Sequence, residues 1–157
     1  MKIPKGTSFD DVIAILSGIK EVQEVFTHID EEMKVQRSWN VTLLIRYIEE
    51  NKKDFPIFRI AVTKEGYNIC KTSRGYEQHR LDRMTANILR EKPVIYIELG
   101  NTHLMIDGTH RLMKAYELGW KSQPGYIVKE EVWKYFLVDN PNSNLSAEEL
   151  LKKDSGL

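Results

Sequence analysis

Residues 107–111, with the sequence Asp-Gly-Thr-His-Arg, combine an acid, a glycine, a hydroxyl, an imidazole and a guanidinium in five consecutive positions. An apolar run leads into this motif and an amphipathic pattern follows it, which predicts that a strand becomes a helix here. The first amides of a helix have no partner within the helix and carry partial positive charge. A strand–glycine–helix junction is therefore suited to binding phosphate groups.

Each side chain of this motif has a predicted role at such a site. Gly108 lets the backbone and a ligand approach closely, and Thr109 either caps the helix or donates to a phosphate oxygen. Arg111 offers a planar fork to the same oxygens, and His110 can donate a hydrogen bond or move a proton near neutral pH. Asp107 can hold Mg²⁺, orient the loop or accept a proton from an attacking hydroxyl.

A simpler interpretation of the motif is helix punctuation, because Asp-Gly is an ordinary turn pair and Thr an ordinary N-cap. That interpretation does not account for the His-Arg pair that follows, because cations in the first turn oppose the helix dipole. The motif therefore favours an anion site.

A second candidate group lies in "SRGYEQHRLDR", residues 73–83, which comes just before a predicted helix. Its basic residues predict a second cationic wall for a triphosphate, with Arg80 as the best single candidate and Glu77 as a possible general base. The alternative is a solvated loop followed by a polar helix face.

The alternation of the predicted elements indicates the α+β class in a single domain. Residues 75–138 are expected to form the core, residues 1–74 an added N-terminal α/β layer, and residues 139–157 a tail. The expected elements are helices at 9–16, 41–53, 81–92, 109–119 and near Ser146; strands at 22–29, 93–99, 102–106 and 124–128; and a hairpin over 57–71.

Composition limits the classes of function. The chain has 157 residues, 41% of them hydrophobic, with 23 Lys plus Arg and 23 Asp plus Glu. This balance counts weakly against nucleic acid as the main ligand. Cys70 is the only cysteine, so no internal disulfide can form, and we expect an inert buried thiol in a reducing, cytoplasmic compartment. No apolar run approaches the ~20 residues of a membrane span.

The segments "LMIDGTHRLMKAYELG" and "PVIYIELGNTHL" resemble the ParB/sulfiredoxin-like superfamily, and the resemblance covers residues 81–128. It implies a small mixed sheet with helices packed around it, and a bound ATP, ADP or CTP whose phosphates lie at the motif. Thr109 stands where sulfiredoxins carry their attacking cysteine, so sulfinic-acid repair is not expected. The Asp-Gly pair is similar to that of the free-serine kinases of the superfamily.

The predicted function is nucleotide-dependent phosphoryl transfer or nucleotide hydrolysis with Mg²⁺. Asp107 would be the base or the metal anchor, and His110 would stabilise the transferred charge. The acceptor would be a small hydroxyl compound, water, or a base or phosphate of DNA, while the oligomeric state stays open. The alternatives are a non-catalytic nucleotide- or DNA-binding module and a ParB-like nuclease. The residues expected to bind the nucleotide are Gly108, Thr109, Arg111 and Arg80.

Overall fold

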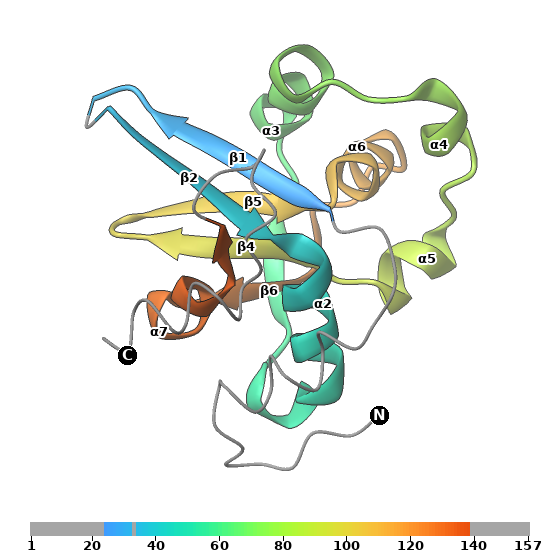
Figure 1. Ribbon diagram of the computed structural model, residues 1–157. Coiled ribbons are helices and arrows are strands. Elements are labelled where there is room, and N and C mark those ends of the chain that lie inside the picture. Colours follow the sequence, from blue (N-terminus) through green and yellow to red (C-terminus); the bar gives the residue numbers. More distant parts are fainter. Residues whose placement is uncertain (1–23, 33, 139–157) are drawn as a thin grey trace, which may run out of the picture. The chain divides into compact units, whose positions relative to one another are not determined.

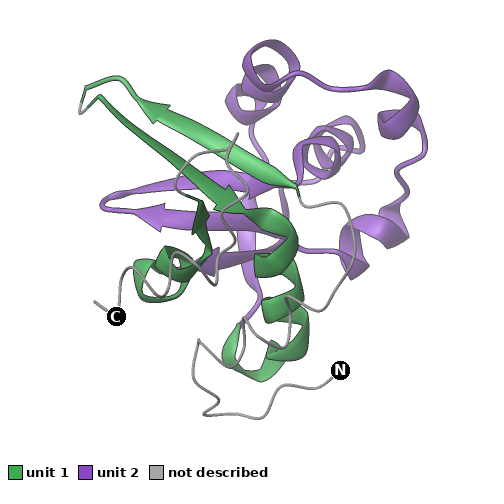
Figure 2. Ribbon diagram, viewed as in Figure 1, with its two compact units in different colours: residues 1–55, 129–157 green, residues 56–128 purple. Residues whose placement is uncertain are grey.

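The computed structural model describes residues 24–32 and 34–138, so the helices expected at 9–16 and near Ser146 lie outside the described residues. The chain divides into two compact units, shown in Figure 2. Unit 1 comprises Met1–Phe55 and Lys129–Leu157, and unit 2 comprises Pro56–Val128. Both units combine helices with a small sheet, which confirms the predicted α+β class. The sequence predicts a core at residues 75–138, whereas the unit that contains most of that range spans residues 56–128.

Unit 1 contains a three-stranded antiparallel sheet in the order β1-β2-β7. β1 and β2 form a hairpin in which Val25 pairs with Asn40 and Asp30 pairs with Val35. The sequence predicted a strand at 22–29 but missed β2, because most residues of β2 are polar and show no clear alternation of apolar and polar side chains. The described elements of unit 1 are β1 (Val25–Asp30), β2 (Val35–Asn40), α2 (Val41–Glu50), a 3₁₀ turn (Lys52–Asp54), α7 (Glu130–Trp133), a second 3₁₀ turn (Lys134–Phe136) and β7 (Leu137–Val138).

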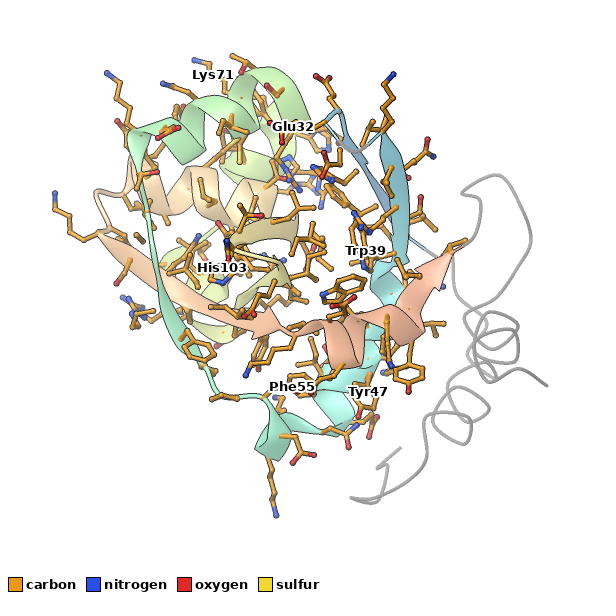
Figure 3. The ribbon with its side chains drawn as sticks, turned by 90° about the vertical axis from the view of Figure 1, so that its left-hand side faces the viewer. Glu32, Trp39, Tyr47, Phe55, Lys71 and His103 are labelled. Atoms are coloured by element: carbon orange, nitrogen blue, oxygen red, sulfur yellow. The ribbon has the colours of Figure 1, made fainter. Side chains whose placement is uncertain are left out.

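Aromatic residues fill the interior of unit 1. Trp39 is fully buried, and its ring meets that of Trp133 edge to face at 5.7 Å. Figure 3 shows Tyr47 beside Phe55, with ring centroids 5.8 Å apart. Edge-to-face contacts of this kind add to the stabilisation from burial alone.

Unit 2 contains a mixed four-stranded sheet in the order β3-β6-β4-β5. The central pair, β4 and β6, is parallel, and the two outer strands are antiparallel to their neighbours. Gly100 lies in the tight turn between β4 and β5 and has a φ of 56°. Glycine adopts such a positive φ more readily than other residues. The strands are β3 (Phe58–Ala61), β4 (Val94–Leu99), β5 (Thr102–Asp107) and β6 (Ser122–Val128).

Helix α6 is central to the helical layer of unit 2, and Figure 1 shows α3, α4 and α5 around it. Leu112 and Met113 of α6 pack with Met105 of β5 in one buried cluster, which also contains Cys70 and Leu81. This burial fits the inert thiol predicted for Cys70. The helical elements are α3 (Lys64–Ile69), a π-helical turn (Cys70–Arg74), α4 (Gln78–Asp82), α5 (Ala86–Glu91) and α6 (Thr109–Glu117).

The returning strand of the hairpin predicted at 57–71 is wrong, because residues 64–74 are helical. Thr63 begins α3 by accepting a hydrogen bond from the Gly66 amide at 3.0 Å. Tyr67 and Cys70, three residues apart, then face the same buried cluster, which is helical rather than strand spacing. The cap at Thr63 therefore favours a helix over the returning strand in this segment.

The helix predicted at 81–92 is two helices. Residues 78–82 form α4, and Thr85 caps α5 by accepting from the Ile88 amide at 3.3 Å. In the part of the chain that the structure describes, no helix is both long and apolar enough to cross a membrane.

Candidate functional site

The strand-to-helix junction predicted at residues 107–111 is present. β5 ends at Asp107, Gly108 occupies the N-cap position with a φ of 127° and a ψ of 17°, and α6 begins at Thr109. A Cβ at position 108 would lie 2.5 Å from Val94 Cγ1 and 2.8 Å from Val94 Cβ. Both the backbone conformation and the contact with β4 therefore require glycine.

A β-bulge precedes the junction. Met105 pairs with Tyr96, but Asp107 pairs with Ile95, so that Ile106 is an extra residue on β5. Bulges redirect the side chain that follows them and are frequent beside functional sites. Here the bulge lies directly before Asp107, whose carboxylate accepts from Arg111 in the first turn of α6.

The first turn of α6 has no side-chain cap, unlike those of α3 and α5. The cap residue is Gly108, and Thr109 is already inside the helix, where its hydroxyl accepts a hydrogen bond from Arg74 Nε at 3.1 Å. The interpretation of Thr109 as an ordinary N-cap is therefore wrong. The first backbone bond of α6 joins the Leu112 amide to the Gly108 carbonyl, so the amides of residues 109–111 have no partner within the helix.

Arg111 is bound by the protein itself. Its Nη2 donates to Asp107 Oδ2 at 2.5 Å, and its Nη1 donates to the carbonyls of Lys92 and Pro93 at 2.9 and 2.8 Å. The side chains of Arg111 and Asp107 are 12% and 21% exposed. The ion pair thus fastens the start of α6 to the end of β5 and to the start of β4.

This ion pair gives Arg111 a structural role that the sequence analysis missed, and it agrees with the loop-orienting role that was one of the alternatives for Asp107. The guanidinium of Arg111 joins three segments of unit 2. A phosphate fork at Arg111 stays a prediction, and it would require this guanidinium to exchange some of its present partners for phosphate oxygens.

Arg74 is the cation that the structure brings to the junction. Its Nε–H holds Thr109, and Asp107 also interacts with it electrostatically. Burial lowers the pKa of the Arg74 guanidinium, while Cys70, Tyr96 and Asp107 oppose that shift. Arginine nevertheless remains charged at neutral pH. The helical spacing of Cys70 and Arg74 could have identified Arg74 as a residue that faces inward toward α6.

His110 and Glu77 meet, but through the backbone of Glu77. His110 Nε2 accepts a hydrogen bond from the Glu77 amide at 2.9 Å, and the imidazole is 9% exposed. The Glu77 carboxylate instead contacts His79 Nε2 at 3.2 Å, on the exposed surface. Arg80 is exposed on α4 and acts electrostatically on His110. Arg80 therefore lies within electrostatic range of His110.

The pKa of His110 is lowered from its ordinary value of 6.5. Burial is the largest cause, Arg80 and His79 act in the same direction, and Glu77 opposes them. The imidazole is therefore neutral near pH 7, in keeping with its role as a hydrogen-bond acceptor.

The Mg²⁺ site predicted at Asp107 stays a prediction, and the surroundings of this carboxylate are unfavourable to a cation. Asp107 is the one carboxylate there, and it is paired with Arg111 and close enough to Arg74 to interact with it. Mg²⁺ requires oxygen ligands, and the nearby guanidiniums would repel it. Within residues 24–32 and 34–138, no group of three or more His, Cys, Asp or Glu side chains is placed to hold a metal ion.

Charge is divided unequally between the two units. Unit 2 has 11 Lys plus Arg and 7 Asp plus Glu, a net charge of +4. Since the whole chain has 23 of each, unit 1 carries 12 and 16, a net charge of −4. The neutral total therefore conceals a basic unit around the junction, and the argument from net charge against anionic ligands does not apply to unit 2.

A scan against protein-family models found no match, and searches of curated proteins and of solved structures found no significant match. The resemblance to the ParB/sulfiredoxin-like superfamily therefore stays a prediction from the motif.

Proposed function

We propose that this protein binds a nucleoside di- or triphosphate, with a phosphate group held at the β5–α6 junction. One observation carries the proposal: the N-terminus of α6 is uncapped, and the Arg74 guanidinium is fastened to Thr109 in its first turn. An open helix N-terminus with an adjacent guanidinium is a favourable environment for a phosphate. The basic charge of unit 2 supports the same conclusion.

The proposed contacts differ from those that the sequence predicted. The amides of residues 109–111 would donate to phosphate oxygens, together with the Thr109 hydroxyl, which keeps its own donor while accepting from Arg74. Arg80, close to His110 on α4, would meet an outer phosphate. Arg111 would hold Asp107 and position the first turn.

Calorimetric titration with ATP, ADP, CTP and GTP tests this proposal. We expect Arg74→Ala to weaken nucleotide affinity by about tenfold or more, because it removes a charge-assisted contact from a partly buried site. Arg59→Ala is the matched control, since Arg59 lies in the same unit but donates to Ser122. Equal losses in both variants would indicate a non-specific effect of charge, and absence of binding in the wild type would refute the proposal.

Thr109 provides a second, more conservative test. Thr109→Val removes the hydroxyl but keeps the shape of the side chain, whereas Thr109→Ser keeps the hydroxyl. We expect weaker nucleotide binding in the valine variant and near-normal binding in the serine variant. The same affinity in both variants would exclude the hydroxyl from the site.

We propose phosphoryl transfer as a second activity of the same site, supported by the proximity of the Asp107 carboxylate to Arg74. To act as a base, Asp107 would have to loosen its ion pair with Arg111. Asp107→Asn should then keep nucleotide binding while turnover falls about 10²-fold or more. If the wild type binds nucleotide without turnover, the protein is a non-catalytic binding module. If the variant turns nucleotide over as well as the wild type, Asp107 is not the base.

A further inference from the structure

Residues 74–77 form a short strap across the first turn of α6. At one end, Arg74 Nε donates to Thr109 Oγ1 at 3.1 Å, and at the other the Glu77 amide donates to His110 Nε2 at 2.9 Å. Gly75 lies between them with a φ of 79°, which lets the backbone turn. Two consecutive helix residues therefore hold the two ends of the strap.

The bond at the Glu77 end exists in one protonation state of His110. A histidine nitrogen accepts a hydrogen bond when the imidazole is neutral, and both ring nitrogens are donors once it is protonated. In protonated His110, Nε2–H would face the N–H of Glu77, two donors with no acceptor between them. Protonation of His110 therefore breaks this bond.

We propose that the strap is a proton-controlled gate at the phosphate site, closed by neutral His110 and opened when His110 is protonated. In the open state, His110 Nε2–H and the Glu77 N–H both become available to oxygens of one anion, which would take the place of the N–H···N bond. The binding of an anion in the open state rests on the proposed phosphate site, whereas the opening of the strap does not.

The charged groups around His110 determine where the gate operates. Arg80 and His79 of α4 add positive charge, and Glu77 adds negative charge. On α6 itself, Arg111 is paired with Asp107, and Lys114 Nζ lies 3.9 Å from Glu117 Oε1. Arg80 and His79 disfavour protonation of His110 because they repel a further positive charge. An anion bound among these groups would offset that repulsion and so favour protonation of His110. Proton and anion should therefore bind cooperatively.

Amide hydrogen exchange of Glu77, measured by NMR in the wild type between about pH 8 and about pH 5, tests the gate. We expect the protection factor to fall as His110 is protonated. His110→Gln supplies an acceptor that does not titrate and should keep this amide protected throughout. The matched control His79→Gln should keep the loss of protection at low pH, moved toward higher pH because His79 lowers the pKa of His110. A Glu77 protection factor independent of pH in the wild type would overturn the gate.

Sulfate, which keeps its charge over this range, tests the coupling to anion binding. We expect sulfate affinity to rise about fivefold or more as His110 is protonated, at the lower end of typical coupling between two ligands, and to stay flat in His110→Gln. A pH-dependent strap without sulfate binding would preserve the gate and count against the phosphate site. Sulfate binding with the same pH dependence in His110→Gln would overturn the coupling.

Discussion

Among the described residues, two strand-to-helix junctions follow antiparallel hairpins, one in each unit. In unit 1, β2 ends at Asn40, whose side chain accepts a hydrogen bond from the Leu43 amide at 3.0 Å and caps α2. In unit 2, β5 ends at Asp107, and Gly108 takes the cap position without a side chain. The two junctions thus share their local architecture and differ at the cap.

That difference separates a structural junction from a candidate binding site. Asn40 is 6% exposed, and its side-chain Oδ1 accepts a hydrogen bond from the Leu43 amide in the first turn of α2. At the other junction, the side-chain hydrogen bonds join Arg74 to the Thr109 hydroxyl and Arg111 to the Asp107 carboxylate. Neither of these bonds uses a backbone amide of the first turn. A helix N-terminus attracts a ligand when its own cap leaves the amides available.

Gly108→Ala should be the most damaging change at either junction. The new Cβ would occupy a left-handed conformation and collide with Val94. We expect a loss of about 3 kcal/mol or more in the free energy of unfolding, measured by chemical denaturation. In Gly119→Ala, where φ is 79° and nothing lies within 4 Å of the new Cβ, the loss should be about 1–2 kcal/mol. Equal losses would mean that Val94 does not constrain the junction.

Arg111→Ala should lower the free energy of unfolding by about 2–3 kcal/mol even without nucleotide, because Asp107 and two carbonyls lose a charged partner. A double-mutant cycle with Asp107→Ala isolates the ion pair. Unchanged stability would restore the sequence-based role of Arg111 as a free phosphate fork.

Asn40→Ala should cost about 1–2 kcal/mol, since it removes the cap of α2. Asn40→Asp keeps an acceptor and should restore most of this loss. Thr109→Ala, at the uncapped junction, removes a partner of Arg74 and no cap, so its cost should largely disappear in an Arg74→Ala background. If the cost of Thr109→Ala is the same in both backgrounds, the contrast between the capped and the uncapped junction fails.

The smallest effect concerns pH. His110 has a lower pKa in the folded protein than in the unfolded chain, where it is near its ordinary value of 6.5. The unfolded state therefore binds the proton more tightly, so the stabilisation is complete above about pH 6.5 and is lost as pH falls through the folded pKa. The difference in stability between wild type and His110→Gln, followed from about pH 8 to about pH 5, should show this loss.

The sequence by itself was sufficient for the local features of unit 2 that surround the motif. An apolar run, a Gly-Asn turn and a second apolar run predicted β4 and β5, and the helical spacing after Asp107 predicted α6. These signals are local, because a turn residue or a hydrophobic period acts within a few residues of itself. The amphipathic pattern after Asn40 predicted α2 for the same reason.

Only the tertiary structure decided which partners the side chains of the site take. Arg111 meets carbonyls 18 and 19 residues away, Arg74 meets a hydroxyl 35 residues away, and His110 meets an amide 33 residues away. No pattern in the sequence specifies these pairs, because they arise when α6 lies against the segment that leads into β4 and the segment before α4. Whether a guanidinium serves the fold or a ligand depends on which acceptors that packing brings within hydrogen-bond reach.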